Sequence, residues 1–414
     1  MKILVVAYAC DPYRGSESGV GWAAVCRIAL HHDVWVLAND SNRRGWERGA
    51  SEGIIPSNVH VRFLRKSKNY FKNRFLARFQ DWLRYADFNH KVLAAAHAWH
   101  AQVGFEMCHQ VTIAAWRMPS PLWRLPIPFV WGPIGGAGWM PPAFRSMLSP
   151  KSRFFETLRD WNTWTVQRSK TFHDCIQNTA VVIAANEETE QFLKPLRGSL
   201  PLLRLPIVSL SPEKIEKFRK KEITPGFGKL RLFAGGNIEG RKGVSLALHA
   251  LADVMARGID FHYTIAGGGP EIGPLQVLCS SLGLNDKVEF HAGYSGDDYI
   301  RALQESDIYF LPSFRESTPV TLMEAYLAGC YPVVADASAQ GEIVRHMGGI
   351  AVKAESQETM AKGLADALVW CHENREILAD ENAVAREKVC SYFSAERYDS
   401  ILTEAYSSAM GETS

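Results

Sequence analysis

Short apolar runs recur along the chain, and a stretch long enough for a helix follows most of them. The first series of runs comprises residues 2–8, 33–38, 104–109, 128–131 and 180–185. A second series comprises residues 229–234, 261–266, 287–292, 307–312 and 331–335. Buried strands that alternate with helices are typical of a parallel sheet covered on both faces. Each series therefore predicts one α/β domain with a doubly wound, Rossmann-like sheet.

A polar and basic segment, residues 211–229, separates the two series. Because the pattern of strands and helices starts again after it, we place a domain boundary near 205–228; a helix inside one larger domain is the alternative. Apolar residues at helical spacing over 393–410 predict a terminal helix. Two doubly wound domains that face each other would hold a ligand cleft between the carboxyl ends of their sheets.

The composition agrees with a globular protein of two domains. The chain has 414 residues, of which 47% are hydrophobic and 22% charged, and its formal net charge is +2. These values exclude a disordered chain and argue against a global nucleic-acid binder. The eight cysteines form no C-x-x-C pair, as expected for reduced thiols. The first apolar run is followed at once by polar residues without a cleavage site, so we expect a strand, no signal peptide and a cytoplasmic protein.

Two glutamates, Glu316 and Glu324, flank a proline between the predicted strand 307–312 and a helix that ends at Gly329. Pro319 suits the first turn of this helix, where a missing N–H costs nothing. Glu316 then lies in the loop at the carboxyl end of the strand, and Glu324 lies about a turn inside the helix. Both carboxylates can therefore face a cleft.

The free amides at the start of this helix offer an anion site beside the two carboxylates. A ligand that is both phosphorylated and polyhydroxylated fits this combination, with Glu324 on a ribose diol and Glu316 on the hydroxyls of a sugar. Around the helix start, the residues that we expect to contact such a donor are Ser317, Thr318 and Val320. The alternative is that both glutamates are solvated side chains that favour the helix dipole.

Residues 232–251 read as a strand, a glycine-rich turn and a helix, with Arg241 and Lys242 at the helix start. Positive charge at that end opposes the helix dipole, so a bound diphosphate explains the two cations better than solvation does. Gly236 permits close approach of the backbone to a ligand, and Asn237 follows it. No D-x-D motif occurs in the chain. We therefore expect no metal, and we assign neutralisation of the diphosphate to the two cations.

Three further features are less specific signs of a binding site than the two motifs above. The turn 265–273 contains Gly267 and Gly269, which we expect near the nucleotide, although such turns also serve simple packing of a strand on a helix. In the first domain, Gly19 lies in a predicted loop after the first strand and is assigned to a phosphate or sugar, with a tight turn as the alternative. His109 at the end of a strand is assigned to a sugar or acceptor contact, with a structural role equally open.

The stretch 307–335, DIYFLPSFRESTPVTLMEAYLAGCYPVVA, resembles the C-terminal-domain signature of the retaining glycosyltransferases of family 4, which have the GT-B fold. Glu316 and Glu324 match the two glutamates of that family, and Lys242 matches its lysine. Asn237 stands where the family has an arginine, which leaves that contact to Arg241.

The resemblance implies two doubly wound domains: residues 1–208 with the returning tail 394–414, and residues 209–393. It also implies a retaining, metal-independent glycosyltransferase of the hexosyl type, which needs no cofactor beyond its nucleotide-diphosphate sugar and serves polysaccharide synthesis at the cell surface. The acceptor would be a glycan or a lipid-linked sugar. The expected catalytic residues are Glu316, Arg241, Lys242 and His109. The alternatives are a sugar-nucleotide epimerase on a similar fold and a two-domain sugar-binding protein.

Residues 62–91 carry nine Lys and Arg against two Asp, interleaved with aromatic residues. Four aromatics at helical spacing form one apolar face: Phe71, Phe75, Phe79 and Trp82. Such a helix can lie on an anionic membrane surface, which would place the protein at the inner face of the membrane. It can equally pack on the sheet of its own domain. Binding to nucleic acid is a poorer explanation, because the whole chain is nearly neutral.

Overall fold

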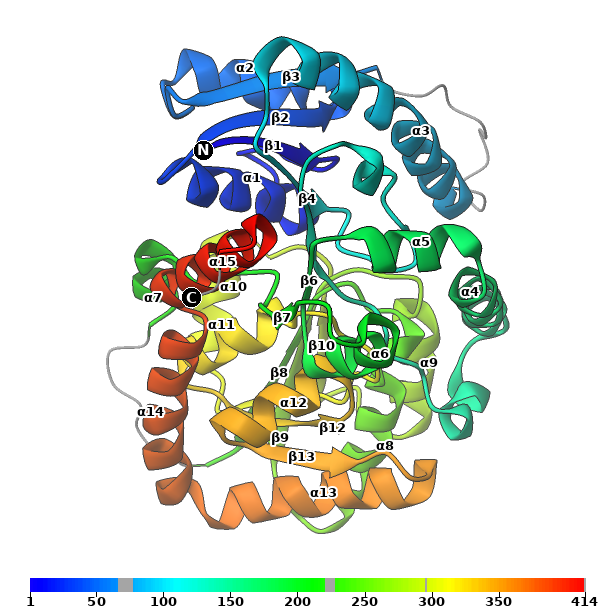
Figure 1. Cartoon of the computed structure of the whole chain (residues 1–414). Coiled ribbons are helices and arrows are strands. Elements are labelled where there is room, and N and C mark those ends of the chain that lie inside the picture. The colour runs from blue at the N-terminus through cyan, green and yellow to red at the C-terminus, as the bar shows by residue number, and fades with distance from the viewer. Residues whose placement is uncertain (66–76, 220–227, 295, 413–414) are drawn as a thin grey trace. The chain divides into compact units, whose positions relative to one another are not determined.

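The computed structural model describes residues 1–65, 77–219, 228–294 and 296–412. The chain divides into two compact units (Figure 1). The first unit comprises Met1–Ala137, Thr163–Ile207 and Tyr398–Ser414, and the second comprises Gly138–Asn162 and Val208–Arg397. Each unit contains a parallel sheet with helices packed on it, so the fold class predicted from the two series of apolar runs is confirmed.

The first unit is built on a seven-stranded sheet in the order β3-β2-β1-β4-β5-β6-β7. Its strands are β1 (Lys2–Ala7), β2 (Asp33–Asn39), β3 (Val59–Leu64), β4 (Met107–Thr112), β5 (Phe129–Ile134), β6 (Val181–Ala184) and β7 (Leu202–Arg204). All the described pairings are parallel. The strand order reverses between β1 and β4, which is where ligands bind in sheets of this kind.

Successive side chains of a strand point to opposite faces of the sheet, so a strand of apolar residues needs cover on both faces. Helices provide this cover. They are α1 (Ser16–Ala29), α2 (Arg43–Ser51), α3 (Ala77–Val103), α5 (Lys170–Asn178), α6 (Glu187–Arg197) and α15 (Ala395–Met410), with short 3-10 turns η1 (Asp40–Asn42) and η3 (Leu122–Arg124). Val5 of β1 packs with α1 and with Tyr406 of α15, whereas Leu4 and Val6 pack with α3. The terminal helix α15 thus belongs to the core of the first unit.

The second unit is built on a six-stranded sheet in the order β10-β9-β8-β11-β12-β13. Its strands are β8 (Leu230–Gly235), β9 (Phe261–Ala266), β10 (Val288–His291), β11 (Ile308–Leu311), β12 (Tyr331–Asp336) and β13 (Ile350–Lys353). The described pairings are again parallel. Here the strand order reverses between β8 and β11.

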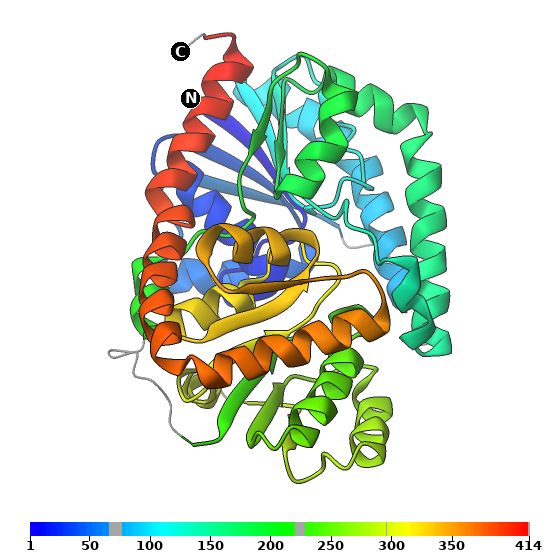
Figure 2. The same ribbon diagram turned by 90° about the horizontal axis from the view of Figure 1, so that it is seen from below.

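The helices of the second unit also lie on both faces of its sheet (Figure 2). They are α7 (Pro212–Phe218), α8 (Val244–Ala256), α9 (Ile272–Ser281), α10 (Gly296–Gln304), α11 (Val320–Ala328), α12 (Ser338–Met347), α13 (Gln357–Glu373) and α14 (Arg375–Tyr392), and a 3-10 turn, η5 (Gly240–Lys242), precedes α8. Helix α8 packs against α13, and α14 packs against both α11 and α12.

The two units differ from the predicted ranges mainly at residues 138–162, which the sequence analysis assigned to the first domain. These residues form η4 (Pro142–Met147) and the first part of α4 (Pro150–Gln167). Phe144 and Leu148 are buried in the core of the second unit, and the ring of Phe144 lies 4.5 Å from that of Phe314. The segment therefore leaves the first unit and adds an apolar patch to the second.

All four aromatics of the predicted membrane-facing side lie outside the described residues: Phe71 and Phe75 entirely, and Phe79 and Trp82 with their side chains. In the described part of the segment, Tyr85 of α3 is buried and its hydroxyl accepts a hydrogen bond from Gln110 Nε2 at 2.8 Å. This end of the segment therefore packs on the sheet. Among the described residues, no helix combines the length and apolar character needed to cross a bilayer.

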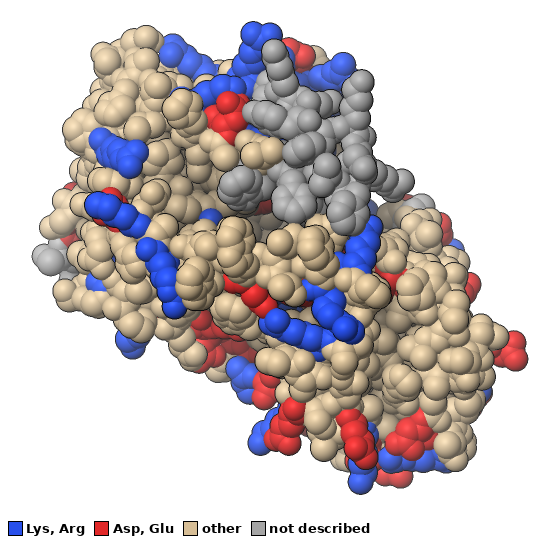
Figure 3. Space-filling model, turned by 90° about the vertical axis from the view of Figure 1, so that its right-hand side faces the viewer, with Lys and Arg blue, Asp and Glu red and all other residues tan. Residues whose placement is uncertain are grey.

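The surface charges are mixed. On the face in Figure 3, Asp and Glu side chains lie among many of the described Lys and Arg side chains. The described charges of this face therefore differ from the basic stripe that marks a nucleic-acid binder.

Candidate active site

The reversal of strand order in the second sheet brings two loops together at the carboxyl ends of β8 and β11. The loop after β8 ends at Gly243, where α8 begins, and the loop after β11 starts at Pro312. Gly243 has φ +68°, and a Cβ there would lie 2.2 Å from the carbonyl oxygen of Pro312. Only glycine fits both that conformation and that distance. The two loops therefore meet backbone to backbone.

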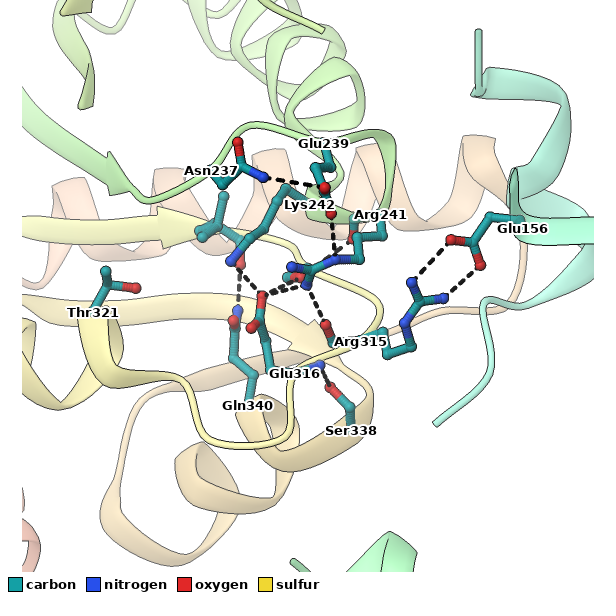
Figure 4. Close-up of polar contacts among 12 residues, drawn as sticks. Glu156, Asn237, Glu239, Arg241, Lys242, Arg315, Glu316, Thr321, Ser338 and Gln340 are labelled. Carbon is teal, nitrogen blue, oxygen red and sulfur yellow. Dashed lines mark hydrogen bonds and ion pairs between the residues drawn. The ribbon is translucent and has the colours of Figure 1, made fainter. Parts of the chain in front are cut away.

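Three charged side chains converge where these loops meet (Figure 4). Lys242 Nζ lies 2.5 Å from Glu316 Oε1, and Arg241 Nη1 lies 3.2 Å from the same oxygen. Lys242 and Glu316 are largely buried, with side-chain exposures of 9% and 11%. The convergence of the predicted cations on the predicted glutamate follows from the strand order, because β8 and β11 are neighbours although they are far apart in sequence.

The electrostatics of Glu316 result from two opposing effects. Burial alone would raise the pKa of this carboxyl, but the charges of Lys242 and Arg241 outweigh it, so the pKa lies below its ordinary value. Hydrogen bonds from Lys242 and from Ser313 Oγ, at 2.8 Å, act in the same direction. Glu316 is therefore ionised at neutral pH, and the two cations stay close to it.

Further hydrogen bonds fix the loop around Glu316. The backbone N–H of Glu316 donates to Ser338 Oγ at 2.9 Å, and Arg241 Nη1 donates to the carbonyl oxygen of Arg315 at 2.6 Å. Arg241 Nε also donates to Glu239 Oε2 at 2.9 Å, and Glu239 Oε1 accepts from Asn237 Nδ2 at 3.1 Å. The predicted residue Asn237 is thus linked to Arg241 through a glutamate (Figure 4).

A hollow of about 650 Å³ opens beside this cluster. It is formed by the turns after β8, β9 and β10 and by the start of α11. The lining residues include Gly236, Asn237, Gly267, Tyr294, Thr321 and Glu324. Four of these are predicted donor-binding residues, so the structure brings Gly236, Asn237, Gly267 and Glu324 to one hollow.

The glycine turns after β8 and β9 touch each other. Gly267 has φ +141°, and a Cβ there would lie 1.9 Å from the carbonyl oxygen of Gly236. A Cβ on Gly269 would lie 2.2 Å from the carbonyl oxygen of Ile238. Gly269 therefore packs the second turn against the first, which is the alternative role that the sequence left open for this turn.

Both carboxylate oxygens of Glu324 have partners. Tyr299 donates its hydroxyl proton to Oε2 at 2.9 Å, and Lys214 Nζ lies 2.7 Å from Oε1. Burial and the neighbouring carboxylate raise the pKa of Tyr299, so this residue remains a hydrogen-bond donor. These contacts hold Glu324 in a fixed orientation at the wall of the hollow.

The predicted contacts at the start of α11 are only partly available. The N–H of Val320 donates to the carbonyl oxygen of Thr318 at 3.0 Å, so this amide is already used. The hydroxyl oxygen of Thr318 is buried and has no hydrogen-bond partner among the described residues. Ser317 is half-buried beside it. The site of expected donor contacts therefore contains one unsatisfied polar atom.

The two predicted site residues of the first unit, His109 and Gly19, make contacts within their own unit. His109 is fully buried; its Nε2 lies 2.8 Å from the carbonyl oxygen of Gly132, and its Nδ1 lies 2.8 Å from the hydroxyl of Tyr406. A carbonyl can only accept, so Nε2 carries the proton and Nδ1 accepts from Tyr406. Burial lowers the pKa of His109 to about 4. Its arrangement gives no support to the catalytic assignment, because both ring nitrogens are occupied.

Gly19 does not lie in a loop. It lies inside α1, which begins at Ser16, and a Cβ on it would lie 2.8 Å from the carbonyl oxygen of Arg14. The predicted loop therefore ends at Gly15, and the placement of Gly19 is corrected to the start of a helix that packs closely on the preceding backbone.

Sequence reasoning missed Lys214, Tyr299, Ser338 and Glu239. Lys214 belongs to the basic segment at the predicted domain boundary, and Glu239 lies in the glycine-rich turn without a predicted role. Tyr299 and Ser338 lie outside the motifs of the sequence analysis. Their contacts depend on the tertiary fold. Among the described residues, no group of three or more His, Cys, Asp or Glu is placed to hold a metal ion.

The two parallel sheets, with a charged site at the strand reversal of the second, define the GT-B fold. The structure of Anabaena Alr3699/HepE in complex with UDP matches over 99% of this chain and 100% of that chain, with a TM-score of 0.64 and 17% identity. Residues 214–380, which contain the site, match the family described as glycosyl transferases group 1. Over these residues the chain is similar to the group 1 glycosyltransferases, in agreement with the resemblance seen in its sequence.

Two relatives illustrate how far the sequence similarity extends. The 2-deoxystreptamine glucosyltransferase of Streptomyces kanamyceticus is 24% identical over 230 residues, which cover 53% of this chain and 59% of that protein. The putative colanic acid biosynthesis glycosyltransferase WcaL of Salmonella typhimurium is 28% identical over 207 residues, which cover 46% of this chain and 50% of that protein. The matched parts thus span little more than half the length of these relatives.

Proposed function

We propose that this protein transfers a sugar, of the hexose type, from a nucleoside diphosphate donor to a hydroxyl of a glycan or lipid-linked acceptor. One observation carries the proposal: Arg241 and Lys242 converge on the buried Glu316 beside a hollow lined by Glu324 and two glycine turns. Two cations are suited to a diphosphate, and two carboxylates are suited to the hydroxyls of a sugar and a ribose.

The roles follow from the positions of the side chains. Arg241 and Lys242 bind the diphosphate and stabilise the charge that develops as it leaves. Glu324, held by Tyr299 and Lys214, accepts hydrogen bonds from the ribose diol. Glu316 accepts hydrogen bonds from the hydroxyls of the transferred sugar. The amides and hydroxyls of Ser317 and Thr318 complete the phosphate contacts.

The reaction that suits this arrangement retains the configuration of the sugar. The acceptor oxygen forms a bond to the anomeric carbon on the face from which the phosphate oxygen departs. The leaving phosphate oxygen takes the electron pair of the broken bond and accepts the proton of the acceptor hydroxyl. The protein positions the substrates and stabilises charge, and no protein nucleophile is needed. His109 is left out of this set, because its ring nitrogens are both occupied.

The relatives suggest which pathway and donor to test first. WcaL is named for the biosynthesis of colanic acid and the HepE structure holds UDP. We therefore propose a role in cell-surface polysaccharide synthesis and place UDP-sugars first in a panel of donors.

Thermal unfolding of the purified protein with UDP, GDP, ADP and their sugar conjugates tests the donor site. A nucleotide at about 100 times its Kd should add roughly 2.7 kcal/mol of stability. We expect the nucleotides of one base to raise the unfolding temperature of the wild type. The same nucleotides should have a weaker effect on the Glu324→Ala variant. If no nucleotide changes the unfolding temperature of the wild type at millimolar concentration, the proposal fails and a sugar-binding protein becomes the better explanation.

Product analysis separates the transferase from the epimerase. The donor that stabilises the protein is incubated with and without a glycan acceptor, and the sugars are identified. Transfer requires the acceptor and releases the nucleoside diphosphate. An epimerised nucleotide sugar formed without any acceptor would favour the epimerase instead.

A further inference from the structure

A segment from the middle of the chain, residues 142–156, contacts the loops that build the donor site. A Cβ on Gly240, in the loop after β8, would lie 2.3 Å from Leu148 Cδ2. After β9, Glu271 Oε1 accepts hydrogen bonds from the hydroxyls of Ser149 and Ser152 at 2.7 and 2.6 Å. One short segment, which we call the brace, thus touches the loops after β8 and β9.

The brace also holds the loop after β11, through Glu156 of α4. Arg315 Nη2 lies 2.9 Å from Glu156 Oε1, and Arg315 Nη1 donates to Glu156 Oε2, so the pair is bidentate (Figure 4). Both side chains are mostly buried, with exposures of 16% for Arg315 and 12% for Glu156. A bidentate pair of this kind fixes both the position and the orientation of the arginine.

Arg315 directly precedes Glu316, and its backbone is part of the charged cluster. Its carbonyl oxygen accepts the hydrogen bond from Arg241 Nη1 at 2.6 Å. The orientation of the Arg315 peptide therefore decides where the guanidinium of Arg241 lies relative to Glu316. Glu156 thus acts on the cluster through the Arg315 peptide, and, against the effect of burial, its charge also helps to raise the pKa of the Arg241 guanidinium.

The charge of Glu156 has a second effect. Burial opposes its ionisation, but the hydrogen bonds and charge of Arg315 outweigh burial and lower the pKa of Glu156. Glu156 is therefore ionised and neutralises Arg315. Without it, the Arg315 guanidinium would be a third cation beside Glu316, and it would compete with Arg241 and Lys242 for that single carboxylate.

We propose that Glu156 is a positioning residue of the donor site. It holds the Arg315 side chain away from Glu316 and fixes the peptide that orients Arg241. This inference rests on the proposed function, because it assumes that the cluster binds the diphosphate of a sugar donor.

The variant Glu156→Gln tests the proposal, because glutamine keeps the size of the side chain but presents an amide in place of one carboxylate oxygen. We expect kcat to fall about tenfold to a hundredfold, as misplacement of binding groups by about 1 Å commonly does. The Kd for the nucleoside diphosphate should rise several-fold, while KM for the acceptor stays unchanged. A loss confined to unfolding temperature would overturn the proposal.

The matched control is Asp307→Asn. Asp307 makes a comparable pair with Arg231, at 2.8 Å, but it precedes β11 and so lies at the opposite end of the strand from the site. We expect this variant to lose stability without a change in kcat or in nucleotide affinity. If Asp307→Asn lowers kcat as much as Glu156→Gln does, a general loss of order explains both results and the specific role of Glu156 is rejected.

A rescue experiment isolates the effect of the freed arginine. Adding Arg315→Gln to Glu156→Gln removes the unpaired cation and leaves two amides that can bond to each other. We expect the double variant to recover part of the lost nucleotide affinity, and no recovery would contradict the competition for Glu316. Failure of the wild type to bind any nucleotide would instead refute the proposed function, and this inference with it.

Discussion

The two strand reversals of this protein have the same topology and different chemistry. At the β1/β4 reversal of the first unit, polar groups bond within the unit: His109 to Gly132 and Tyr406, and Glu17 Oε1 to the N–H of Ala114 at 3.1 Å. At the β8/β11 reversal of the second unit, two cations converge on one carboxylate beside a hollow. Topology thus indicates where a site can form, and the side chains decide what it can bind.

Lys242→Ala should have the largest effect and tests whether the charges of the second unit act on the reaction. Loss of one group that stabilises the developing charge typically costs about 10²–10³ in rate. We expect kcat with the nucleotide-sugar donor to fall by that factor, measured by release of the nucleoside diphosphate. Lys170→Ala is the control, because Lys170 is an 86% exposed cation of the first unit. Equal activity of both variants would show that the charge of Lys242 does not act on the reaction, and the two reversals would then not differ in this respect.

Glu316→Gln should lower kcat by about 10², since an amide cannot hold the two cations as a carboxylate does. The lowered pKa of Glu316 also predicts that the stability of the wild type depends on pH. The pKa of Glu316 is lowered in the folded state, so its ion pairs stabilise the fold above the unfolded value of about 4.3, and this contribution is lost as pH falls through the folded pKa.

The check is the difference in unfolding temperature between wild type and Glu316→Gln. We expect a constant difference from pH 5.5 to 7 and a shrinking one below about pH 4.3. A difference that grows on acidification would contradict the charge assignment for this glutamate.

His109→Gln should reduce stability and leave activity nearly unchanged, which would sharpen the contrast between the two reversals. Disturbing its buried hydrogen bonds should cost about 1–3 kcal/mol in the free energy of unfolding. The folded pKa of about 4 lies below the usual value of about 6.5, so the unfolded chain binds more protons between these values. The wild type should therefore lose stability as pH falls from 6.5 to 4, and the variant should lose less. A fall of kcat beyond tenfold would restore the catalytic assignment.

Gly19→Ala should have the smallest effect. Alanine favours the helix by about 0.5–1 kcal/mol, but its Cβ would lie 2.8 Å from the Arg14 carbonyl, so the net change in unfolding free energy should be within about 1 kcal/mol. Nucleotide affinity should not change, as measured by titration. A large loss of affinity would show that the backbone here does contact the donor.

Much of the architecture could be predicted from local patterns, because buried parallel strands read as continuous apolar runs. The meeting of Lys242 with Glu316 was also predictable, since both follow strands of one sheet. The pair of Glu156 and Arg315 was not, because 159 positions separate its members and no periodicity links them. The helical state of Gly19 was missed because glycine disfavours helices, whereas the close approach of the Arg14 carbonyl, five residues earlier, favours a residue without Cβ.

The charged cluster also bears on how the product of the proposed reaction would be released. Arg241 and Lys242 supply two positive charges, which the carboxylates of Glu316 and Glu239 balance. In the proposed reaction, the departing nucleoside diphosphate has a free terminal phosphate and is more negative than the donor that it came from. The same cations therefore attract the nucleoside diphosphate product more strongly than the nucleotide-sugar donor. This attraction weakens as the salt concentration rises. Turnover would then be limited by escape of the nucleotide, and inhibition by that product would ease as ionic strength rises.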